Sequence, residues 1–110
     1  MSAPAPFVTG LRSRPSTIRL APEGARVITI RVEMPEVWDV VRIAVAPSEP
    51  VLAVKVRALA ALFPEAQMHE DFVLKLHGWE ILDEAASLAA AGVVDGSILL
   101  LTHRRRRAVR

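Results

Sequence analysis

Cysteine is absent from the 110 residues of this chain. Disulfide bonds, thiolate nucleophiles and cysteine-ligated zinc sites are therefore excluded. No stretch approaches the ~20 consecutive apolar residues that a membrane-spanning helix needs. The first ten residues also lack the basic segment followed by an apolar segment that marks a secretory signal. We therefore expect a soluble, unsecreted protein of the cytoplasm.

The residue groupings on which most enzymes depend are also missing. His69, His77 and His103 include no pair spaced three or four residues apart, the spacing that places two imidazoles on one helix face. The adjacent carboxylates at 70–71 and 83–84 have the pattern of solvated charge rather than of a general acid and base. There is no glycine-rich phosphate loop and no nucleophile elbow. We expect no metal, no cofactor, no small-molecule substrate and no catalytic activity.

What the chain does contain suits one small domain, because 52% of its residues are hydrophobic. The formal net charge of +2 hides an asymmetry along the chain. Residues 26–103 hold six basic and eleven acidic side chains, a net charge of −5, whereas residues 104–110 hold five arginines and no acid. The body is therefore acidic and the ends are basic.

The first 24 residues contain four of the eight prolines and show no apolar period. Such a composition buries too little surface to offset the entropy of ordering the chain. We predict a flexible, proline-rich N-terminal arm over residues 1–25, a folded domain over 26–103 and a basic C-terminal tail over 104–110.

Within residues 26–103 the apolar pattern predicts an α+β fold with the order ββαββ. Strict alternation over 28–34 and again over 38–45 indicates two strands of a hairpin. Apolar residues at every third or fourth position over 51–62 predict a helix that ends at Pro64, with Ser48 or Glu49 as its cap and Lys55 on its solvent side.

The second half of the domain predicts three further strands. Residues 72–76, 80–82 and 97–102 have strand character, with a tight turn at His77-Gly78-Trp79. The alanine-rich residues 85–91 predict one or two helical turns that end at Gly92. One long helix is therefore expected to pack on one face of a mixed sheet.

Three segments carry a family resemblance, and one of them is residues 74–78, which resemble the third strand of ubiquitin and its glycine turn. Residues 45–55, Val-Ala-Pro-Ser-Glu-Pro-Val-Leu-Ala-Val-Lys, resemble the stretch of ubiquitin that runs from its second strand into its helix. Residues 88–99 are similar to the segment that leads into the final strand. The version Gly92-Val93-x-Asp95-Gly96 is closer to bacterial ubiquitin-like proteins of the YukD type, found beside type VII secretion systems. The resemblance implies a ubiquitin-like β-grasp fold over residues 27–102.

The departures from ubiquitin bear on function. Conjugated relatives end in Gly-Gly, whereas this sequence ends in arginines and contains no internal Gly-Gly, so we expect that the usual activating enzymes cannot use it. The recognition patch on the outer sheet face is also changed, because its central isoleucine corresponds to Lys75 and its neighbours to Leu100 and Thr102. Common ubiquitin-binding domains should therefore bind poorly.

Trp38 and Trp79 offer a replacement for that patch, since tryptophan is enriched at interface hot spots. Each could instead cover an edge of the core. The tail has two interpretations as well. It is either a solvated terminus, or a segment used for conjugation or for binding a polyanion such as nucleic acid or an anionic membrane. Because no aromatic residues interleave with its arginines, we expect nucleic-acid binding without sequence preference. The arginines concerned are Arg104, Arg105, Arg106, Arg107 and Arg110.

Three functions follow in order of preference. The first is a noncatalytic protein-protein interaction module that works within a secretion-associated or other multi-protein assembly. The second is a ubiquitin-like modifier that a dedicated enzyme set attaches covalently. The third is a basic-tailed adaptor for nucleic acid or membrane.

Overall fold

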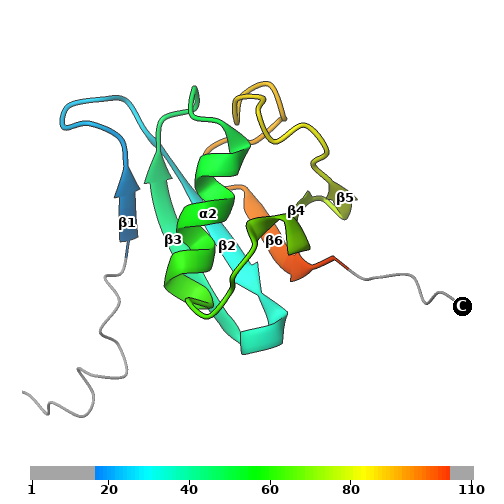
Figure 1. The fold of residues 1–110 in the computed structure, drawn as a ribbon. Coiled ribbons are helices and arrows are strands. Elements are labelled where there is room, and N and C mark those ends of the chain that lie inside the picture. The colour runs from blue at the N-terminus through cyan, green and yellow to red at the C-terminus, as the bar shows by residue number, and fades with distance from the viewer. Residues whose placement is uncertain (1–16, 105–110) are drawn as a thin grey trace, which may run out of the picture.

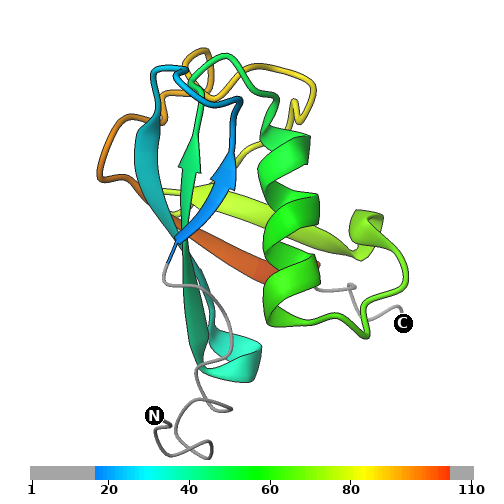
Figure 2. The same ribbon diagram turned by 90° about the vertical axis from the view of Figure 1, so that its left-hand side faces the viewer.

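The computed structural model describes residues 17–104, over which one mixed sheet packs against one long helix (Figure 1). The strands follow the order β1-β3-β2-β6-β4-β5 across the sheet. The α-helix lies along a single face (Figure 2). The elements are β1 (Thr17–Leu20), β2 (Ile28–Met34), the 3-10 turn η1 (Pro35–Val37), β3 (Asp39–Val45), α2 (Val51–Leu62), the 3-10 turn η2 (His69–Asp71), β4 (Phe72–Leu76), β5 (Trp79–Glu80) and β6 (Ile98–His103).

The core lies between α2 and the sheet, as the apolar pattern predicts. Alternate residues of β2, from Ile28 to Met34, are buried, and Val54 and Ala58 of α2 are fully buried against them. β2 pairs antiparallel with β3 and parallel with β6, so the last strand of the domain occupies the middle of the sheet. The predicted β-grasp fold is confirmed.

The helix begins where expected but is capped differently. Pro50 is the N-cap residue, and no side chain caps the helix, so the prediction of Ser48 or Glu49 as cap is wrong. Instead the amides of Val51 and Leu52 each donate a hydrogen bond of 2.9 Å to the carbonyls of Ala86 and Glu84. A loop distant in sequence thus satisfies donors that the first helical turn leaves free.

Lys55 was expected on the solvent side of the helix, and this expectation is wrong. Its side chain is only 1% exposed, and its Nζ donates to the carbonyl oxygen of Phe72 at 2.9 Å and to Glu84 Oε2 at 2.7 Å. A buried ammonium group is tolerated when it is paired and hydrogen-bonded. The residue pattern of the helix gives no sign of either partner, because both lie in later segments.

The alanine-rich segment forms consecutive turns rather than the expected short helix. The amide of Gly92 donates to the carbonyl of Ala89 at 3.1 Å, and the amide of Val93 donates to the carbonyl of Leu88 at 3.0 Å. This is the Schellman pattern, which closes a helical turn and needs the positive φ of 92° that Gly92 adopts. The glycine cap is therefore present, but it ends the segment before a helix is established.

The N-terminal side of the domain begins earlier than predicted. β1 pairs parallel with the outer edge of β3, and its Ile18 is 7% exposed, so residues 17–20 are not part of a flexible arm. A strand of four residues is too short to show alternation, and it is positioned by the free edge of β3. Residues 1–16 of the predicted arm and residues 105–110 of the predicted tail lie outside the described residues.

Between residues 17 and 104, no helix has the length and apolar character required to cross a membrane.

Replacing Ile18 with alanine tests the contribution of β1. Removing a buried isoleucine side chain should lower the free energy of unfolding by roughly 2 kcal/mol. The exposed neighbour Thr17 supplies the matched control, because Thr17→Ala removes no buried surface. Urea denaturation of both variants measures the difference, and equal midpoints would show that β1 contributes nothing to stability.

The buried lysine gives a second prediction. Lys55→Ala leaves Glu84 and the Phe72 carbonyl without their donor and should destabilise the domain by roughly 3–5 kcal/mol. The double replacement Lys55→Met with Glu84→Leu removes both charges and should recover part of this loss. Thermal unfolding of the single and double variants checks the prediction, and a double variant less stable than Lys55→Ala would contradict it.

Candidate interaction surface

The face of the sheet opposite α2 brings together the three residues predicted to occupy the positions of the ubiquitin patch. Lys75 of β4 lies directly opposite Leu100 of β6, and Thr102 of β6 lies opposite Val73 of β4. Lys75, Leu100 and Thr102 are all partly exposed. The predicted patch is thus continuous in space, with a cation at its centre.

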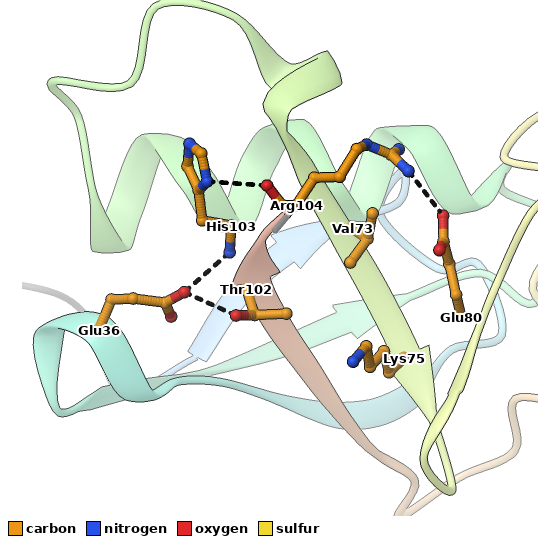
Figure 3. A pocket seen from close by; sticks show the side chains of 7 residues that line it. All are labelled: Glu36, Val73, Lys75, Glu80, Thr102, His103 and Arg104. Carbon is orange, nitrogen blue, oxygen red and sulfur yellow. Dashed lines mark hydrogen bonds and ion pairs between the residues drawn. The ribbon is translucent and has the colours of Figure 1, made fainter. Parts of the chain in front are cut away.

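Beside this patch lies an open depression of about 930 Å³ (Figure 3). It contains Lys75 and Thr102 from the predicted set, but Leu100 does not line it. Its other lining residues are Glu36, Val73, Glu80, His103 and Arg104. Strand alternation places Val73 on the same face as Lys75, so the sequence pattern could have identified it. The pattern could not have identified Glu36, which is separated from its partner Thr102 by 66 residues of sequence.

Glu36 ties the β2–β3 connection to the end of β6. One of its carboxylate oxygens accepts hydrogen bonds from the Thr102 hydroxyl at 2.6 Å and from the backbone amide of His103 at 2.8 Å. Partial burial acts to raise the pKa of Glu36. These two hydrogen bonds, with a smaller contribution from His103, outweigh burial and hold the pKa below its ordinary value of 4.5.

Arg104 is held against the folded body. Its guanidinium lies 3.3 Å from Glu80 Oε2 (Figure 3). Its backbone amide donates to the carbonyl of Asp71 at 2.6 Å. The first arginine of the predicted tail therefore belongs to the edge of the depression. Arg105, Arg106, Arg107 and Arg110 lie outside the described residues.

Neither tryptophan covers an edge of the core. Trp38 is 94% exposed and Trp79 is 79% exposed. Trp38 follows η1 at the β2–β3 connection, whereas Trp79 pairs with Leu76 at the opposite end of β4 from Phe72. Because Glu36 joins the first of these regions to Thr102 and His103, the two indoles lie toward opposite ends of β6, at separate places on the molecule.

Among residues 17–104, no three histidine, aspartate or glutamate side chains lie close enough together to hold a metal ion. The polar groups around the depression instead bond to one another, through Glu36 to β6 and through Arg104 to Glu80. This arrangement fixes the relative positions of surface groups, as a preformed binding surface requires.

Replacing Glu36 with glutamine tests the tie to β6. Since the folded pKa is lowered, the carboxylate stabilises the fold fully above about pH 4.5, and this stabilisation disappears as the pH falls through the lower folded pKa. The variant should therefore melt at a lower temperature than the parent at pH 7, and the two melting temperatures should converge as the pH falls below 4.5. Melting temperatures across this range measure the effect, and a constant gap would contradict it.

No family model matches the sequence, and no curated protein matches it. Solved structures do match its fold. The ubiquitin-like domain of an Arabidopsis thaliana protein has a TM-score of 0.62 and 20% identity, over 82% of this chain and 92% of that one. Caldiarchaeum subterraneum ubiquitin has a TM-score of 0.61 and 20% identity, over 74% of this chain and 99% of that one.

The ubiquitin-like domain of Plasmodium falciparum Dsk2 has a TM-score of 0.59 and 22% identity, over 70% of this chain and 97% of that one. Identities this low show the fold alone. Together with the sheet order and the single helix, they establish that residues 17–104 adopt the ubiquitin-like β-grasp fold.

Proposed function

We propose that this chain is a noncatalytic, cytoplasmic protein-protein interaction module that binds its partner through exposed tryptophans. The observation that carries the proposal is the exposure of Trp38 and Trp79 on a rigid β-grasp scaffold. Burying apolar surface favours association, and indoles present the largest apolar surface of any side chain. Two such groups left in solvent are therefore available to a partner.

Trp38 is the stronger candidate for partner binding, because its side chain contributes nothing to the stability of the fold. Its backbone is left-handed, with φ 53° and ψ 45°. This region favours glycine and asparagine, and a bulky residue there costs on the order of 1–3 kcal/mol. Asparagine or glycine would serve the connection better than tryptophan does, so folding stability does not explain the residue. Binding to a partner does.

Trp79 is presented by a tight turn of a different kind. His77 and Gly78 both have positive φ, 55° and 85°, the combination that closes a two-residue hairpin. The turn places Trp79 on the short edge strand β5, beside a hollow of about 620 Å³ lined in part by Leu76, Ile81 and three alanines. A partner side chain that enters this hollow would contact the indole.

We also propose a bacterial origin and a partner within a secretion-associated assembly. The support is the likeness of residues 92–96 to the bacterial ubiquitin-like proteins. In this chain Gly92 and Gly96 both use the left-handed backbone, with φ of 92° and 88°, so both glycines of that pattern have a conformational role.

Replacing Trp38 with asparagine separates binding from folding. Because asparagine tolerates the left-handed backbone, the variant should melt at the same temperature as the parent or higher. Capture of the partner by the tagged full chain, from the native cell under native conditions, should fall at least tenfold. Arg57→Ala, on the exposed face of α2, is the matched surface control and should capture normally.

The same capture is carried out with the Trp79→Ser variant. In a separate experiment, the parent chain is captured under strong denaturant. Unchanged capture by both tryptophan variants would refute the proposed mode of binding. Slower-migrating adducts that survive the denaturant would instead identify a covalent modifier, and mass spectrometry of the junction peptide would locate the attachment residue.

A further inference from the structure

Two arginines face each other on the outer side of the sheet. Arg31 of β2 and Arg42 of β3 are direct cross-strand partners, and both are exposed. Within the part of the chain that the structure describes, neither guanidinium forms a hydrogen bond or an ion pair. Like charges directly opposite each other destabilise a sheet. The fold alone therefore gives no reason for this pair.

The pair has a hollow on one side and an exposed apolar residue on the other. A depression of about 230 Å³ lies beside the two arginines, and its rim includes Thr29 and Asp95. The Asp95 carboxylate accepts a hydrogen bond from the backbone amide of Thr29 at 2.8 Å. On the other side of Arg31, its register partner Ile98 on β6 is 48% exposed. A row of Arg42, Arg31 and Ile98 thus crosses three adjacent strands.

We propose that this row is a docking site for an acidic segment of a partner protein, with one carboxylate between the two guanidiniums and one apolar side chain on Ile98. The site goes beyond the proposed function, because it includes neither tryptophan and sets its own ligand chemistry. Charge complementarity supports it, since a carboxylate placed there removes the repulsion between the arginines and forms charge-assisted hydrogen bonds with both.

The spacing of the row specifies the ligand further. Adjacent strands lie about 4.8 Å apart, so Ile98 is about 7 Å from the midpoint of the arginine pair. In an extended peptide, residues i and i+2 point to the same side and are separated by about 6.7 Å. The ligand is therefore an extended segment with an acidic residue, any residue, and then an apolar residue.

A protein segment fits this site better than a nucleic acid does. A polyanion gains affinity from many cations along its path. Here Glu33 lies two residues beyond Arg31 on the same face, Asp95 lies on the rim, and residues 26–103 carry a net charge of −5. A single carboxylate meets two cations, but a longer polyanion meets repulsion on both sides.

An NMR titration with a defined peptide tests the proposal. The probe is an acetylated, amidated Gly/Ser peptide that contains one Glu-Ser-Leu unit, and its control carries Gln-Ser-Leu. The expected result is a shift of the backbone amide signals of Arg31, Arg42 and Ile98 that saturates with the first peptide and is at least tenfold weaker with the second. A third peptide with Glu and Leu adjacent should bind more weakly than the probe.

Variants of the full chain complete the test. Arg31→Gln with Arg42→Gln should abolish the shifts and raise the melting temperature, because the repulsion is gone, whereas Arg57→Gln and Trp38→Asn should leave peptide binding unchanged. Equal binding of the Glu and Gln peptides, or no saturable shift at millimolar peptide, would overturn the proposal. Tighter, arginine-dependent binding of a single-stranded oligonucleotide would overturn it in favour of a nucleic-acid site.

Discussion

The buried ammonium group of Lys55 links parts of the chain that the sheet alone does not hold together. It joins α2 to the first residue of β4 through the Phe72 carbonyl and to the loop after β5 through Glu84. A charge removed from water requires both partners, so the position of the loop is coupled to the position of the helix. The same loop in turn positions the start of α2, since the carbonyls of Glu84 and Ala86 accept hydrogen bonds from the first amides of the helix.

This coupling is what makes the surface around β5 rigid. β5 has only two residues, and an isolated pair of that length would be marginal in water. It is held by the His77-Gly78 turn on one side and by the loop anchored to Lys55 on the other. The exposed indole of Trp79 is therefore carried by a preorganised support, and the proposed binding of a partner there would lose less entropy.

The sequence predicts the parts of this structure that local periodicity controls. The alternation of β2 and β3 and the apolar spacing of α2 predicted the correct elements, and the ubiquitin-like sequence of residues 45–55 indicated the correct fold. Lys55, Glu36 and β1 were beyond such reasoning, because each is decided by a partner far away in sequence or by an edge that only the folded sheet provides. The structure places Lys75, Leu100 and Thr102 together on the outer face of the sheet, whereas the part of Glu36 and Glu80 in the neighbouring depression was not foreseen.

The central place of β6 has a consequence for how the protein is made. β6 lies between β2 and β4, and its Leu99 and Leu101 are fully buried. Until residues 98–103 have left the ribosome, β2 and β4 have no strand between them, and the apolar side of the hairpin has an incomplete core to pack against. The domain therefore cannot complete its fold before residues 98–103 have been synthesised, and until then the nascent chain exposes an unpaired sheet edge of the kind that chaperones protect.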